Sequence, residues 1–178
     1  NLNDKSNIIV AINMNSDRLG SVVSATPNVV NYFGWRHNDL IGKNITTIMP
    51  GFLKDRHDGY LKAHLNDGKV GLLFDNRLSY GENKLGYLIP VYLYVTPHPN
   101  VHKLFHYVGI LKPIEHPEGV LLINENEDIL GVTENLNKEL GLNSQHCNRT
   151  KISDLCPDFK YVNYILNFMF LLKEKHLL

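Results

Sequence analysis

Three β-prone segments follow one another in the middle of the chain, and they constrain the fold more than any other feature. The segments 71–80, 86–97 and 104–111 are rich in leucine, tyrosine, valine and isoleucine. Two turn signals separate them, Gly81-Glu82-Asn83-Lys84 and His98-Pro99-Asn100. Aliphatic and aromatic runs joined by short polar turns are typical of β-hairpins. The sequence therefore predicts an antiparallel meander of three strands.

A longer helix is expected just before this meander. In the segment 55–66, Tyr60, Leu61 and Leu65 recur at helical spacing, and Gly68 follows at the position of a glycine cap. Two short β-prone segments and short helical stretches come earlier in the chain. The predicted order is two strands, short helices, one longer helix and three strands, which is an α+β fold. This first unit is expected to span residues 6–113.

A linker and a second unit are expected after the meander. Residues 114–118 have the proline and charge content of a linker, and a new β-prone run, Val120-Leu121-Leu122-Ile123, follows. The segment 129–141 repeats the outline of 22–34, a β-prone run, a polar turn, a short helix and a glycine stop. Residues 119–178 have room for only the first half of such a domain, so we expect a partial second unit.

The apolar segment 161–172 is expected to form an amphipathic helix at the end of this second unit. Tyr161, Ile165, Phe168 and Leu172 recur at helical spacing. The segment is shorter than the ~20 apolar residues needed to cross a bilayer. We therefore expect a helix that packs on a sheet or on a partner, with a membrane-proximal segment as the alternative.

Composition narrows the possible partners and the cellular compartment. The 18 basic and 18 acidic side chains balance to a formal net charge of zero, which argues against nucleic acid as the partner. Cys147 and Cys156 lack CxxC spacing and do not form a secreted disulfide framework, which indicates a reducing compartment. We expect a cytoplasmic location, or the cytoplasmic face of a membrane protein. Because the chain starts at Asn1 rather than at methionine, a fragment of a larger protein is expected.

Several motifs in the first unit resemble the PAS domain family in order and spacing. They are Phe33-Gly34-Trp35, the segment 39–45, Ile48-Met49-Pro50, the segment 56–61, Arg77, Gly81, and Gly86 followed by Ile89-Pro90-Val91. The resemblance implies a five-stranded antiparallel sheet with short helices on one face. The second unit resembles the front half of another PAS domain, so the chain resembles a tandem with one complete and one partial domain. It is also similar to PAS regions of large protist membrane proteins of the tiny-macrocyst type, which implies a membrane-bound parent protein.

The resemblance also raises the possibility of haem. Arg56-His57-Asp58-Gly59-Tyr60-Leu61 resembles the helix that supplies the proximal histidine in oxygen-sensing PAS domains. By this resemblance His57 would be the axial ligand of the iron and Arg77 would respond to the bound gas, while an apolar distal wall would be formed by Leu72, Leu93 and Val95. Many PAS domains carry the same motif without haem, and Ala63 and Gly71 stand where haem-binding relatives place propionate-binding cations. We therefore expect no cofactor, with haem as the alternative.

Flavin photochemistry and enzymatic activity are not expected. Light-sensing relatives have a reactive cysteine after the Gly-x-Asn turn, whereas Gly42-Lys43-Asn44 is followed here by Ile45. The chain has no nucleophile elbow, phosphate-binding loop or HExxH helix. Arg77 has an alternative role, as an ion-pair partner of Asp58 or Asp75.

We thus expect a non-catalytic sensor or protein-interaction module that binds a protein partner or a larger assembly. The binding surface would be the face of its sheet or its terminal helix. Alternating tyrosines on strands are suited to such a surface, and the sequence predicts four exposed ones: Tyr80, Tyr87, Tyr92 and Tyr94.

Overall fold

The computed structural model describes residues 6–67, 73–99, 105–115, 118–141 and 150–157. The chain divides into two compact units, one of Asn1–Leu85 with Ile89–Glu115 and the other of Gly86–Leu88 with His116–Leu178.

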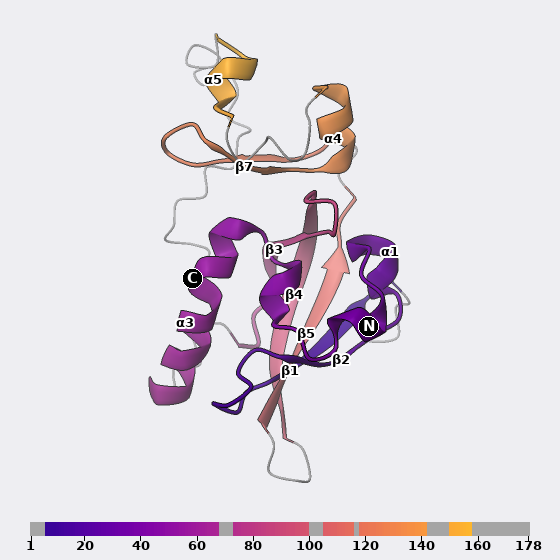
Figure 1. Ribbon diagram of the computed structural model, residues 1–178, viewed down its shortest axis with the longest axis vertical. Coiled ribbons are helices and arrows are strands. Elements are labelled where there is room, and N and C mark those ends of the chain that lie inside the picture. Colours follow the sequence, from indigo (N-terminus) through magenta and orange to yellow (C-terminus); the bar gives the residue numbers. More distant parts are fainter. Residues whose placement is uncertain (1–5, 68–72, 100–104, 116–117, 142–149, 158–178) are drawn as a thin grey trace. The chain divides into compact units, whose positions relative to one another are not determined.

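The first unit has the predicted order of elements (Figure 1). Two strands come first and are followed by three short helical segments, then a long helix and three further strands. The elements are β1 (Ile8–Asn13), β2 (Val22–Ala25), α1 (Val29–Phe33), α2 (His37–Leu40), the 3-10 helix η1 (Ile45–Ile48), α3 (Gly51–Asp67), β3 (Arg77–Glu82), β4 (Leu88–Pro99) and β5 (Phe105–Pro113).

The five strands form one sheet in the order β2-β1-β5-β4-β3. β1 pairs antiparallel with β2 and with β5, and β5 pairs antiparallel with β4. β5 is therefore the central strand of the sheet and lies between β1 and β4. The prediction of a five-stranded antiparallel sheet is confirmed.

The register of β1, β5 and β4 assigns their residues to two faces. Partnered residues share a face, and neighbours along a strand alternate between faces. On the inner face, Ile8 pairs with Leu111, which pairs with Leu93. On the outer face, Ile9 pairs with Ile110, which pairs with Tyr94.

The core lies between the inner face of the sheet and the helical segments. Ile8, Val10, Val91 and Leu111 contribute from the strands. The helical segments contribute Val29, Phe33, Leu40, Ile45, Ile48 and Leu61. The helices thus cover the inner face, as expected.

Two predicted boundaries were wrong. The strand predicted over 71–80 begins only at Arg77, because Phe74 has a left-handed φ of 68° that an extended strand does not allow. The backbone N–H of Phe74 instead donates to the carbonyl of Val95 at 2.9 Å. The helix predicted over 55–66 begins earlier, at Gly51, because Pro50 precedes it and its carbonyl accepts from the N–H groups of Leu53 and Lys54.

The described residues of the second unit form a hairpin and two short helices. Its elements are β6 (Leu121–Ile123), β7 (Ile129–Val132), α4 (Glu134–Glu139) and α5 (Ile152–Leu155), and β6 pairs antiparallel with β7. Its core contains Ile123, Ile129, Val132 and Ile152. The terminal helix predicted over 161–172 lies outside the described residues. Within the described part of the chain, every helix is too short or too polar to cross a membrane.

Candidate functional site

His57 lies on α3, one helical turn before the buried Leu61, so both side chains share the helix face that packs toward the sheet. The imidazole is largely buried, with 22% of its side chain exposed. Its Nδ1 atom is fully buried and has no hydrogen-bond partner among the described residues. Asp58 Oδ1 lies 3.8 Å from Nδ1, which is an ion-pair separation and too long for a hydrogen bond.

The surroundings of His57 favour its neutral form. Burial lowers the pKa of His57 below its ordinary value, and the positive charge of Arg77 adds to this effect. Asp58 opposes it, because a nearby carboxylate stabilises the imidazolium. A neutral imidazole is the form of histidine that can bind a metal.

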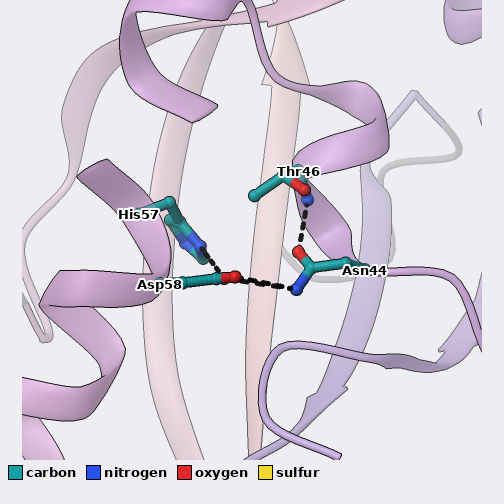
Figure 2. A network of polar contacts seen from close by, with 4 residues as sticks. All are labelled: Asn44, Thr46, His57 and Asp58. Atoms are coloured by element: carbon teal, nitrogen blue, oxygen red, sulfur yellow. Dashed lines mark hydrogen bonds and ion pairs between the residues drawn. The ribbon is translucent and has the colours of Figure 1, made fainter. Parts of the chain in front are cut away.

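Asp58 is held by Asn44 in a polar network that sequence reasoning missed (Figure 2). The Nδ2 group of Asn44 donates to Asp58 Oδ1 at 3.2 Å and to Oδ2 at 3.3 Å. The Oδ1 atom of Asn44 accepts from the backbone N–H of Thr46 at 2.9 Å and so caps η1. The network joins the start of η1 to α3. The available signal was an asparagine directly before a helical segment, although the sequence does not reveal its distant partner.

Arg77 stands at the start of β3 and is half-buried. Burial lowers the pKa of its guanidinium, and the nearby carboxylate of Asp75 raises it. Asp58 and Asp75 were the two acids predicted as possible ion-pair partners of Arg77. The carboxylate of Asp75 stabilises the charge of Arg77, and the carboxylate of Asp58 accepts hydrogen bonds from Asn44.

The predicted apolar wall can be located in part. Leu93 and Val95 both lie on the inner face of the sheet and are half-buried, and Leu93 packs against the core. Leu72 lies outside the described residues. Of the predicted site residues, His57 and Arg77 interact through charge, since the guanidinium of Arg77 contributes to the lowered pKa of His57.

A cavity of about 210 Å³ lies between the end of α3 and the sheet. It is lined by Met14, His64, Leu65 and Tyr107. The hydroxyl of Tyr107 and Nε2 of His64 are hydrogen-bonded, and their rings meet edge to face with centroids 5.4 Å apart. Sequence analysis missed this pair. The available signal was that His64 follows His57 by seven residues, two helical turns along the same face.

The residues near His57 fit haem only in part. The iron requires an axial imidazole, and the neutral, largely buried His57 meets that requirement. The propionates require cations or other donors, and Ala63 is an exposed, uncharged residue of α3. Gly71 lies outside the described residues.

The outer face of the sheet carries an apolar surface that belongs to neither buried core. Two cross-strand rows make it up, Ile9–Ile110–Tyr94 and Ala11–Val108–Thr96, and they are half-buried. Tyr92 stands beside them with 47% of its surface exposed. We call this set of residues the outer surface.

Of the four tyrosines predicted to be exposed, only Tyr92 is exposed. Tyr80 on β3 is buried, and burial raises the pKa of its phenol. Tyr92 is exposed as predicted, whereas Tyr87 and Tyr94 are half-buried. The alternation of residues along β3 does not predict the burial of Tyr80, because that burial depends on how the whole unit packs.

No family model matches the chain. The PAS domain of an HTR-like protein from Haloarcula marismortui is 14% identical with a TM-score of 0.46, over 62% of this chain and 84% of that one. The PAS domain of the fruit-fly ELK potassium channel is 14% identical with a TM-score of 0.48, over 65% and 92%. The PAS domain of a protein from Colwellia psychrerythraea is 14% identical with a TM-score of 0.47, over 61% and 86%. Over 61–65% of its length, the chain is thus similar to solved PAS domains.

Proposed function

We propose that the chain is a non-catalytic PAS-type sensor or protein-interaction module of a larger protein, and that it docks a protein partner on the outer surface. The observation that carries this proposal is the composition of the outer surface. Ile9, Ile110 and Tyr94 stand in one cross-strand row across three strands, opposite the face that the helices cover.

The physical chemistry of this surface suits association. Removing apolar side chains from water is favourable, and tyrosine combines a large apolar ring with a hydroxyl that can bond across an interface. Polar residues flank the apolar rows. Lys112 pairs with Tyr92 at one end, and His106 pairs with His98 and Asn13 at the other. An apolar centre with a polar rim is the usual anatomy of a protein interface.

Sedimentation of the full chain over a concentration series tests the outer surface, with a second copy of the chain as the partner. We expect concentration-dependent association that Ile110→Lys weakens by at least about tenfold, because the interface would have to bury an ammonium group. Ile110→Thr keeps the β-branched shape and should weaken it less. Val30→Lys is the matched control, because Val30 is an exposed β-branched residue on α1, outside the outer surface.

Thermal unfolding of each variant verifies that it is folded. A wild-type chain that stays monomeric at the highest concentration would contradict docking of a second copy through this surface. Equal loss of association in Val30→Lys would contradict it as well, because the effect would then not depend on the outer surface.

As a sensor, the module would transmit a change through β5. This central strand carries Tyr107 beside the cavity, and its last residue, Pro113, leads into the linker 114–118. We propose domain limits of 6–113 for the PAS-type unit and 119–178 for a partial second unit of the same type. A shift of β5 would then reach the second unit through the linker.

Haem binding through His57 is the second candidate function, favoured by the neutral, largely buried imidazole. We nevertheless expect a colourless protein after incubation with haemin and gel filtration, because Ala63 offers the propionates no cation. The absorption spectrum is the measurement. A retained Soret band that His57→Ala abolishes and His64→Ala preserves would establish the alternative, since both histidines lie on the same face of α3.

A further inference from the structure

Trp35, the only tryptophan of the chain, lies under two lysine side chains. The Nζ atom of Lys43 is 4.5 Å from the centroid of the indole, and that of Lys84 is 4.9 Å from it. Both separations are within the range of a cation–π interaction. The two ammonium groups come from segments far apart in sequence, the loop after α2 and the turn between β3 and β4.

Backbone hydrogen bonds fix both lysines beside the indole. The N–H of Lys84 donates to the carbonyl of Phe33 at 2.9 Å, which ties the β3–β4 turn to the end of α1. The carbonyl of Lys43 accepts from the N–H of Val22 at 2.7 Å, which ties its loop to β2. Gly34 takes a left-handed φ of 69° that ends α1 directly before Trp35. The cluster is therefore built into the fold and does not depend on flexible side chains alone.

The charge of this cluster is not balanced within the described part of the chain. Neither Lys43 nor Lys84 is in an ion pair with a described residue, whereas Lys138 in the second unit bonds Glu134 at 2.7 Å. Two like charges directed at one ring repel each other, and an added anion would relieve that repulsion. The chain as a whole is neutral, so this positive charge is local.

Exposed apolar side chains adjoin the two lysines in sequence. Leu85 follows Lys84 and is 65% exposed, and Ile41 precedes Lys43 by two residues and is 40% exposed. We propose that Trp35, Lys43, Lys84, Ile41 and Leu85, the Trp35 surface, dock an acidic peptide segment that also carries aliphatic side chains. This interaction is separate from docking on the outer surface.

The Trp35 surface combines positive charge with exposed apolar side chains, and this combination favours a peptide over a small inorganic anion as its ligand. Phosphate would gain from the ammonium groups but nothing from Ile41 or Leu85. A peptide whose acidic and aliphatic residues alternate gains from both, because it pairs its carboxylates and removes leucine side chains from water. Charge complementarity would also speed encounter and make the association sensitive to salt.

The fluorescence of Trp35 reports on this surface directly, because no other tryptophan contributes. The probe is a synthetic peptide of alternating glutamate and leucine, titrated into the full chain. We expect a saturable fluorescence change that vanishes at about 1 M salt, where the screening length is about 3 Å. Lys43→Gln and Lys84→Gln should each weaken binding by up to about fivefold. Lys62→Gln, which removes an exposed lysine of α3, is the control.

Two further ligands make the outcome decisive. The same peptide with glutamine in place of glutamate should not bind, and inorganic phosphate should bind more weakly than the acidic peptide. Equal binding of the glutamine peptide would overturn the role of the lysines, and phosphate binding as tight as the peptide would overturn the peptide as occupant. Unchanged affinity in both lysine variants, with near-ultraviolet circular dichroism confirming their fold, would also overturn the proposal.

Discussion

Replacing Phe33 by alanine is expected to lower the free energy of unfolding by about 3–5 kcal/mol, the usual cost of deleting a fully buried aromatic side chain. Phe33 is the last residue of α1 and is 0% exposed in the core beneath the sheet. The truncation removes apolar contacts and leaves a cavity that the surrounding helices can close only in part.

Urea denaturation monitored by circular dichroism measures this change. Phe74→Ala is the matched control. Because Phe74 is 53% exposed, its replacement should lower the free energy of unfolding by much less than that of Phe33. If both variants lost a similar free energy of unfolding, the ring of Phe33 would not be packed in the core as the structure places it.

The sequence predicts most of the fold of the first unit because strands and helices have local signatures. β4 and β5 are aliphatic and aromatic segments with turn residues between them, so their existence needs no knowledge of tertiary contacts. The start of β3 was misplaced for the opposite reason. Phe74 adopts a left-handed conformation, which a sequence pattern does not assign to a phenylalanine.

The candidate sites were harder to predict because they combine residues from distant segments. His57 was recognised from a local motif, and its burial and lowered pKa follow from packing on the sheet. His64 and Tyr107 are 43 residues apart, and only the folded chain places their side chains in hydrogen-bonding contact. The same holds for Trp35 and Lys84, which meet because the β3–β4 turn bonds the end of α1.

Gly81 in β3 is expected to be intolerant of any side chain, because Phe33 occupies the space beside it. A Cβ atom at position 81 would lie 2.7 Å from Cζ of Phe33 and 3.2 Å from the carbonyl oxygen of Ile48. Carbon atoms do not approach so closely, so the ring of Phe33 or the strand must move. We expect Gly81→Ala to lower the free energy of unfolding by about 1–3 kcal/mol, the typical cost of overpacking a core.

A double-mutant cycle with Phe33→Leu identifies the cause of that loss. Leucine lacks the ring edge that a Cβ at position 81 would meet, so the double variant should be more stable than the sum of the single losses predicts, by about 0.5–3 kcal/mol. Gly59→Ala is the control, because a Cβ there meets nothing within 4 Å on the exposed side of α3, and it should leave stability unchanged or raise it by about 0.5–1 kcal/mol. Strict additivity of Gly81→Ala and Phe33→Leu would mean that the two residues do not compete for space, and that β3 does not lie against α1 as the structure places it.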